Sequence, residues 1–239
     1  MVFRLVGVSS SPMKKRSTYT LLHHALEHAK AAVLELVPEA EVEVTEVCLA
    51  QKKILPCCDC HACTRKGTLC VLKDDWLECM DPILNPSPPD GLILAAPVYF
   101  HGTNSQIRAF MERWTSLFKP IWHKEIQRKP PDFTKTVAGA VSVGAHRNGG
   151  VEEAVNSMLS FLISVGFLTV GSFDLEHGSI GYTGGTGYTA VPGFEDKGIA
   201  ADEWGMLSAA ILGRRIGETA VRLRLGRTEV LPRKESEGS

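Results

Sequence analysis

The sequence predicts an α/β protein in which helices cover both faces of a five-stranded parallel sheet. Short apolar segments of strand length alternate along the chain with longer segments whose apolar residues recur at helical spacing. This alternation indicates strand–helix–strand units, which form right-handed crossovers on a parallel sheet. Several of the strand segments are almost continuously apolar, as expected of strands that are buried on both faces.

The first half of the chain supplies two strands and two helices. Residues 2–9 are apolar and end in a serine cluster, which predicts a strand followed by a polar loop, and residues 17–37 have helical spacing. Residues 41–49 alternate between apolar and polar types, which predicts a second strand. Residues 75–84 are expected to form a brief helix, because the proline-rich segment NPSPPD follows them.

The second half continues the same alternation. It predicts strands at 91–96, 135–143 and 168–173 and helices at 103–118, 151–165 and 196–225. Five strands suit the flavodoxin-like three-layer sandwich with strand order 2-1-3-4-5, in which ligands bind at the carboxyl ends of the strands. The glycine-rich segment 178–198 is expected to form a mobile loop that covers the ligand site or contacts another subunit, with a disordered surface loop as the alternative.

Composition and charge set further limits. We expect one domain over residues 1–230, with a cysteine-rich loop at 54–72 inserted after the second strand and a flexible tail at 231–239. The net charge is −1, from 26 basic and 27 acidic residues, so nucleic acid is not an expected partner. No apolar run is long enough to span a membrane and the N-terminus lacks a secretory pattern, so we expect a cytoplasmic protein.

Four cysteines form the compact pattern C-x2-C-x2-C-x6-C, at Cys57, Cys60, Cys63 and Cys70. The short gaps let the thiolates turn toward one centre, and four thiolates suit an iron–sulfur cluster or zinc. Zinc ribbons usually pair two separate C-x2-C turns, so this spacing favours a cluster. Zinc and free thiols are the alternatives, while the odd total of 7 cysteines disfavours a disulfide framework. Cys58 is out of step and is not expected to be a ligand.

Three loops with ligand-binding character follow strands of the predicted sheet. Residues 9–18 offer hydroxyl groups at a helix N-terminus and suit a single phosphate, although a serine-rich helix cap is the alternative. Residues 96–105 carry adjacent aromatic residues that suit a flat heteroaromatic ligand, or that lie at the edge of the core. Residues 144–150 contain glycines that allow close backbone approach. The chain has no G-x-G-x-x-G after its first strand and no Walker lysine motif, which disfavours a Rossmann-type dinucleotide site or a nucleoside triphosphate site.

The three loops together resemble those of a known protein family. SSSPMKKRST, AAPVYFHGTNSQIRAFMERW and GAHRNGGVEEAV resemble the phosphate loop, the flavin-ring loop and the third loop of NAD(P)H-dependent FMN reductases. With the cysteine motif, the chain resembles the iron–sulfur flavoprotein branch of that flavodoxin-like superfamily. The resemblance implies phosphate contacts from Ser9, Ser11, Ser17 and Thr18, and flavin-ring contacts from Pro97, Val98, Tyr99, Phe100 and Gly102, with Gly144, Arg147 and Gly149 on the other side.

The resemblance also implies FMN, a [4Fe-4S] cluster on the four cysteines, and a homodimer or homotetramer. A flavin accepts two electrons and a cluster exchanges one, so the pair forms a two-to-one electron junction. We therefore expect an FMN-dependent oxidoreductase that passes electrons between NAD(P)H or another redox donor, FMN and the cluster, toward a redox acceptor, without a catalytic acid or base from the protein. The alternatives are a zinc-stabilised or cluster-free flavin-binding protein and an electron carrier without NAD(P)H oxidase activity.

Overall fold

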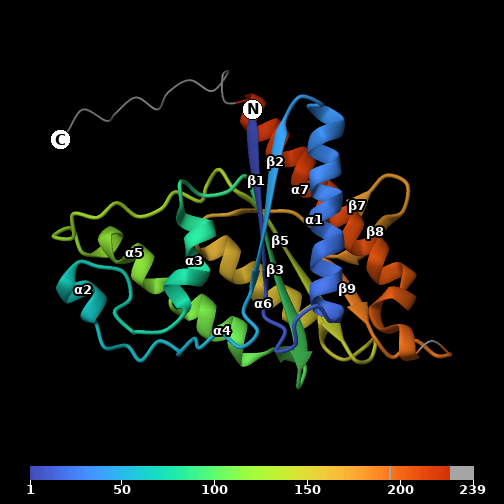
Figure 1. Ribbon diagram of the computed structural model, residues 1–239, viewed down its shortest axis with the longest axis horizontal. Helices are drawn as coiled ribbons and strands as arrows, with labels where there is room; N and C mark the ends of the chain where they lie inside the picture. The colour runs from blue at the N-terminus through green and yellow to red at the C-terminus, as the bar shows by residue number, and fades with distance from the viewer. Residues whose placement is uncertain (194, 227–239) are drawn as a thin grey trace.

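A mostly parallel sheet runs through the molecule in the order β2-β1-β3-β5-β6 in the computed structural model, which describes residues 1–193 and 195–226 (Figure 1). Its strands are β1 (Val2–Ser9), β2 (Glu41–Cys48), β3 (Gly91–Tyr99), β5 (Val137–Gly144) and β6 (Leu168–Thr169). This is the predicted order 2-1-3-4-5, because β5 and β6 stand at the fourth and fifth predicted positions. The tail predicted at 231–239 lies outside the described residues.

The fifth strand position differs from the prediction. Only β6 pairs with the start of β5, and β7 (Ser172–Asp174) turns away to pair with β8 (Gly178–Tyr182) in a separate two-stranded sheet. Strand β9 (Gly185–Tyr188) then returns to pair with the end of β5. The predicted mobile loop is therefore partly strand. Its glycines allow close packing, since a Cβ at Gly185 would lie 2.7 Å from Val141 Cγ1.

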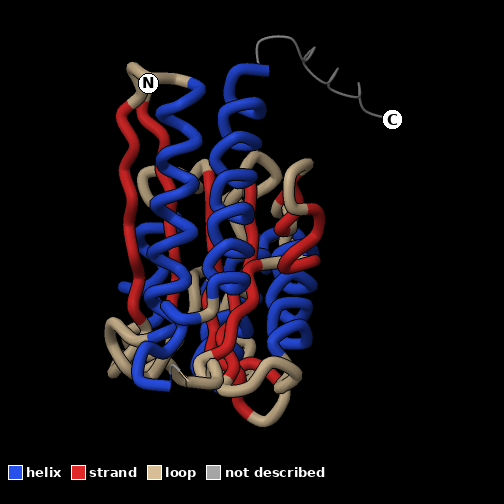
Figure 2. The backbone as a smooth tube through the Cα atoms, turned by 90° about the vertical axis from the view of Figure 1, so that its right-hand side faces the viewer, coloured by secondary structure: helices blue, strands red, loops and turns tan. Residues whose placement is uncertain are grey.

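Two helices cover one face of the sheet. Helix α1 (Ser17–Leu36) and helix α7 (Glu203–Gly226) lie side by side there, and Figure 2 shows them in front of the strands. Their apolar residues pack against strand residues such as Leu5 and Ile93. The 3-10 segment η1 (Glu195–Ala201) precedes α7, so the predicted helix 196–225 begins later than expected. The reason is Asp202, whose Oδ1 accepts a hydrogen bond from Gly205 N at 3.1 Å and starts the helix after η1.

The opposite face carries the larger core. Its helices are α3 (Trp76–Leu84), α4 (Ser105–Glu112), α5 (Thr115–Trp122) and α6 (Val151–Ser164). Their buried side chains pack on Val6, Val8, Leu92 and Leu94, which alternate in sequence with the residues that face α1 and α7. This alternation makes a three-layer structure.

The predicted helix 103–118 is wrong, because two helices meet at Arg113 and Trp114. At the junction, Ser116 N donates to Arg113 O at 3.2 Å and Leu117 N donates to Trp114 O at 2.8 Å. These bonds span three residues and not four, so the helix tightens and changes direction. The preceding segment also contains β4 (Gly102–Thr103), which pairs antiparallel with the end of β3.

Within the described part of the chain, no helix combines the length and apolar character that a membrane crossing would need.

Candidate functional site

The first predicted loop gathers phosphate-binding features at the carboxyl end of β1. Ser9 is buried, and its hydroxyl oxygen has no hydrogen-bond partner among the described residues. Within the described chain, no side chain caps α1 and its first turn contains no acidic residue, so the backbone N–H groups there are open to an anion. The alternative of a serine cap is therefore wrong: the cap position is Arg16. A buried hydroxyl without a partner beside an uncapped helix N-terminus fits a phosphate group.

A pair of hydrogen bonds joins this loop to the second one. The hydroxyl of Ser10 donates to Asn104 Oδ1 at 2.9 Å, and Asn104 Nδ2 donates to Ser10 O at 2.6 Å. Both residues are buried, and Asn104 also caps α4 by accepting from Ile107 N. Asn104 therefore fixes the start of α4 against the phosphate loop.

The second loop is a strained hairpin. Strands β3 and β4 pair through Tyr99 and Gly102, and the two turn residues Phe100 and His101 have φ values of 48° and 69°. Positive φ at both positions is the geometry of a type I′ turn, which normally contains Asn-Gly because larger side chains are strained there. The turn leaves Phe100 fully exposed and Tyr99 half exposed. These aromatic residues are therefore not part of the core edge, and strain of this kind is typical of ligand sites.

The third loop lies directly against the hairpin. Gly150, with a φ of 102°, precedes α6, and a Cβ on it would lie 2.6 Å from His101 Cα. On the other side, Arg147 Nη2 donates to Tyr188 Oη at 2.7 Å, which ties the loop to β9. The guanidinium of Arg147 also lies over the Tyr188 ring, 4.8 Å from its centroid.

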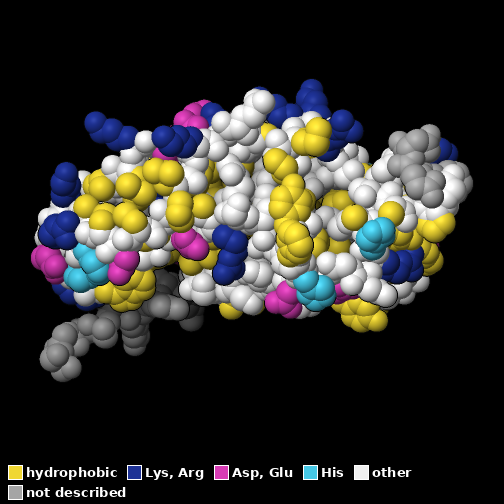
Figure 3. All heavy atoms as spheres, turned by 90° about the horizontal axis from the view of Figure 1, so that it is seen from below, with side chains coloured by type: hydrophobic (Ala, Val, Ile, Leu, Met, Phe, Trp, Pro, Cys, Tyr) yellow, Lys and Arg dark blue, Asp and Glu magenta, His cyan; other side chains and the backbone are white. Residues whose placement is uncertain are grey.

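All three loops meet at one edge of the sheet. Figure 3 views the molecule from this side, where hydrophobic patches lie among scattered basic side chains. The structure brings together the predicted phosphate and flavin-ring residues at the carboxyl ends of β1, β3 and β5. Their individual contacts with a flavin stay predictions.

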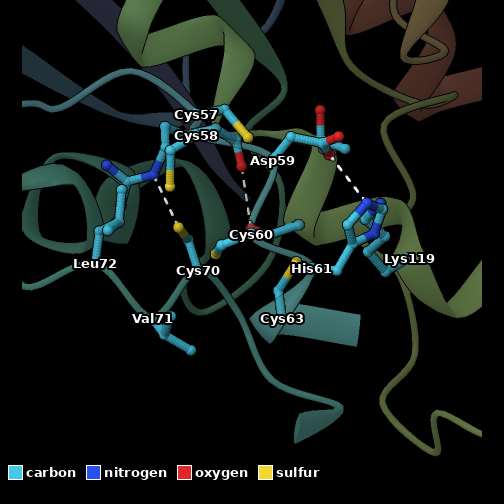
Figure 4. Close-up of a pocket in the computed structure, with 13 residues that line it drawn as sticks. Cys57, Cys58, Asp59, Cys60, His61, Cys63, Cys70, Val71, Leu72 and Lys119 are labelled. Atoms are coloured by element: carbon cyan, nitrogen blue, oxygen red, sulfur yellow. Dashed lines mark hydrogen bonds and ion pairs between the residues drawn. The ribbon is translucent and has the colours of Figure 1, made fainter. Parts of the chain in front are cut away.

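The cysteine-rich loop forms a separate pocket beside α4 and α5. Cys57, Cys60, Cys63 and Cys70 all line it, and so does Cys58 (Figure 4). Asp59 and His61 have φ values of 49° and 54°, which turn the chain sharply on either side of Cys60. A short helix, α2 (Ala62–Lys66), follows within the loop. A hydrogen bond from the backbone N–H of Ala62 lowers the pKa of the Cys60 thiol.

The chemistry of this pocket suits a thiolate-bound metal group. The pocket also contains Arg113 and Lys119, whose positive charges would balance anionic sulfur. The hollow has a volume of about 30 Å³, and in the described parts of the chain no three His, Cys, Asp or Glu side chains are close enough to hold one metal ion. The donor set therefore fits a metal group by type, and its sulfur atoms must turn inward to bind one.

A buried ion pair supports the cysteine loop. The side chains of Arg113 and Asp74 are both fully buried, with Arg113 Nη1 2.7 Å from Asp74 Oδ2. Burial alone would raise the pKa of Asp74, but hydrogen bonds from Arg113 and from two backbone N–H groups outweigh it and hold the pKa below its ordinary value. Arg113 Nε also donates to Cys70 Sγ at 2.9 Å.

Helix α4 connects the two parts of the site. Its N-terminus begins at Asn104, next to the strained hairpin, and its C-terminus ends at Arg113, next to the cysteines. Between them, Gln106 Nε2 donates to Leu49 O at 3.0 Å and to Lys52 O at 2.8 Å, where the cysteine loop leaves β2. One helix therefore sets the position of the cysteine loop relative to the three sheet-edge loops.

Comparison with known proteins identifies the family. The model of the NADPH-dependent FMN reductase family matches residues 3–178, which include all three sheet-edge loops and the cysteine loop. The chain belongs to this family. It is therefore an oxidoreductase of a flavoprotein family, and the phosphate-binding features and exposed aromatic residues agree with FMN as its cofactor.

Curated relatives of this oxidoreductase carry a more specific name. The iron-sulfur flavoprotein MJ1083 of Methanocaldococcus jannaschii is 31% identical over 216 residues, covering 90% of this chain and 96% of the relative. An iron-sulfur flavoprotein of Archaeoglobus fulgidus is 29% identical over 217 residues, covering 90% and 95%. An iron-sulfur flavoprotein of Methanosarcina thermophila is 31% identical over 168 residues, covering 70% and 77%.

Solved structures confirm the fold. The NAD(P)H:quinone oxidoreductase from Methanothermobacter marburgensis superposes with a TM-score of 0.52 at 13% identity, covering 92% of this chain and 97% of that one. The crystal structure of RosB with a bound intermediate has a TM-score of 0.53 at 16% identity, covering 99% of this chain and 92% of that one. At these identities the likeness shows the fold alone.

Four residues that position the site were not among the predicted site residues. They are Ser10, Asn104, Arg113 and Gly150. The sequence contains one indication that Arg113 is buried: a charged residue among Phe110, Met111 and Trp114 is unusual for an apolar helix face. The roles of the others depend on contacts between loops that are distant in sequence.

Proposed function

We propose that this oxidoreductase passes electrons between NAD(P)H or another redox donor, FMN at the sheet edge, and a [4Fe-4S] cluster held by Cys57, Cys60, Cys63 and Cys70. The observation that carries this proposal is the connection through α4. The helix starts at the flavin-type hairpin and ends at Arg113, whose guanidinium bonds to Cys70. The names of the curated relatives support the same pairing of groups.

When bound, FMN would accept a hydride and the cluster would exchange single electrons, so two electrons from one donor could leave one at a time. The protein's own residues would hold the two groups in place. Ser9 and the N-terminus of α1 would hold the phosphate, and the hairpin at Phe100 would line the ring. Arg113 and Lys119 would offset the negative charge at the cysteines.

We also propose that the protein works as a homodimer or homotetramer, with the cysteine pocket of one subunit near the flavin edge of another. Support comes from an exposed apolar surface on α5, where Ile121 and Trp122 are 46% and 62% exposed. A hollow of about 710 Å³ lies next to them, lined by Trp114, Phe118 and Phe161 among others. Surfaces of this kind are typical of contact sites between proteins.

The test is anaerobic purification followed by an absorption spectrum and assays for FMN, iron, sulfide and zinc. The proposal predicts flavin bands together with a broad cluster shoulder, and iron and sulfide in near-equal amounts. Stoichiometric zinc without sulfide would instead support a zinc-stabilised flavin-binding protein. Flavin without any metal would support a cluster-free one.

Two variants and one reaction sharpen this test. Cys60→Ala should remove iron while FMN stays bound, because the flavin loops come from other segments of the chain. Cys58→Ala is the matched control and should keep both groups, although Cys58 lines the same pocket.

Mixing the protein with NADH or NADPH without oxygen should bleach the flavin. A flavin that stays oxidised would identify an electron carrier that receives its electrons from another donor.

A further inference from the structure

The buried side chain of Arg113 contacts several residues of the cysteine loop and its base. Its side chain is fully buried, and it donates from Nη1 to Leu55 O at 2.9 Å and to Asp74 Oδ2 at 2.7 Å. Its Nε donates to Cys70 Sγ at 2.9 Å, and its guanidinium lies over the Trp76 ring at 5.1 Å. A single side chain therefore contacts residues on both sides of the cysteine motif.

Asp74 also bonds to backbone groups on both sides of the cysteine loop. Its Oδ2 accepts from Leu55 N at 2.9 Å and its Oδ1 accepts from Trp76 N at 3.1 Å. Leu55 therefore bonds to Arg113 through its carbonyl and to Asp74 through its N–H group. This closes the cysteine loop at its base, where residue 55 meets residues 70 to 76.

We propose that Arg113 is a positioning residue that clamps the cysteine loop and holds a positive charge against Cys70. The planar guanidinium can reach a carbonyl, a carboxylate and a sulfur together, which a lysine ammonium on a flexible stem does not do in one fixed geometry. Asp74 offsets part of that positive charge and holds the Arg113 guanidinium in place.

The charge has a consequence that rests on the proposed function. One-electron reduction adds negative charge to a group held by Cys70, and a nearby cation stabilises the reduced form. Removing the cation should therefore make the reduction potential more negative. Removing the anion at Asp74, which leaves Arg113 uncompensated, should make it less negative. A role in folding alone would not give shifts of opposite sign.

The experiment compares Arg113→Gln, Arg113→Lys and Asp74→Asn with wild type. The matched control is Arg108→Gln, because Arg108 lies on the same helix and donates from Nη1 to Ser157 Oγ on the exposed surface. For the protein reconstituted with iron and sulfide, spectroelectrochemistry should show shifts of opposite sign for Arg113→Gln and Asp74→Asn. Each is expected to change the reduction equilibrium about tenfold, or ~59 mV for a one-electron couple. Arg113→Lys should stay near wild type.

A second readout uses the chain without metal. Hydrogen exchange of peptides covering residues 53–72 should become at least about tenfold faster in all three variants, because each loses contacts of the clamp. Arg108→Gln should exchange like wild type. Exchange that is unchanged in Arg113→Gln and Asp74→Asn would overturn the clamp, and potentials that stay fixed or move in the same direction would overturn the charge role. If wild type takes up no iron and sulfide, the proposed function fails and the exchange data alone decide the role of Arg113.

Discussion

Gly150 lies so close to His101 that a Cβ on the glycine would be 2.6 Å from the histidine Cα. This contact seats the loop after β5 against the hairpin after β3. We predict that Gly150→Ala pushes the two loops apart and weakens FMN binding by about tenfold or more, which corresponds to ~1.4 kcal/mol. It should also lower the free energy of unfolding by about 1–3 kcal/mol. Flavin fluorescence titration and urea denaturation measure the two effects.

Gly166→Ala is the matched control for this prediction. Gly166 also has a left-handed backbone, with φ of 94°, but the nearest described atom to its Cβ would be Thr134 Cγ2 at 3.7 Å. The two variants share the backbone strain and differ in the loop contact. Equal losses of FMN affinity in both would show that the contact with His101 is unimportant.

The strained turn at Phe100 and His101 should lower the stability of the protein while it favours FMN binding. Replacing it with Asn-Gly, as in Phe100→Asn with His101→Gly, relieves two positive φ values and should stabilise the protein by about 1–3 kcal/mol. The same change removes the exposed ring and should weaken FMN binding. Tyr182→Asn is the control, because Tyr182 has φ of 51° and is 75% exposed at a site outside the predicted flavin contacts. If the double variant binds FMN as wild type does, Phe100 has no role in binding.

Helices α1 and α7 pack with almost no space between them. A Cβ on Gly213 would lie 2.0 Å from Ala25 O, a backbone atom that no side-chain rotation can move. Gly213→Ala should therefore separate the helices and destabilise the protein by about 1–3 kcal/mol in urea denaturation. Gly226→Ala, where no described atom lies within 4 Å of the new Cβ, should change the stability by less than about 0.5 kcal/mol.

Two histidines on α1 should make the stability depend on pH. Burial, followed by the neighbouring His28 and His23, lowers the pKa of His24 from its ordinary value of 6.5. Burial and then Arg214 lower the pKa of His28. The unfolded chain therefore binds these protons more readily, and stability should fall as the pH drops below about 6.5 and return above it. His24→Gln with His28→Gln should flatten this part of a pH series of urea denaturation curves, and an unchanged slope would contradict the prediction.

The sequence predicted most of the elements because they depend on local periodicity. The alternation of apolar segments located the strands, and the order 2-1-3-4-5 is the order of the structure. The fifth strand was harder, because Leu168–Thr169 and Gly185–Tyr188 share one position beside β5 while the segment between them forms a hairpin elsewhere. Periodicity cannot show which of several short segments pairs with a given strand.

For the site, the sequence by itself determined the residue types: the cysteine spacing, the serine loop and the adjacent aromatic pair. Only the tertiary structure decided how they are held. Arg113 pairs with Asp74 across 39 positions and Ser10 pairs with Asn104 across 94. The Ser10–Asn104 contact arises because parallel strands place their carboxyl ends at one edge of the sheet. The Arg113–Asp74 contact arises because α4 runs from that edge to the cysteine loop. The residue pattern along the chain indicates which chemical groups are present, whereas the path of the chain through the sheet determines which of these groups are in contact.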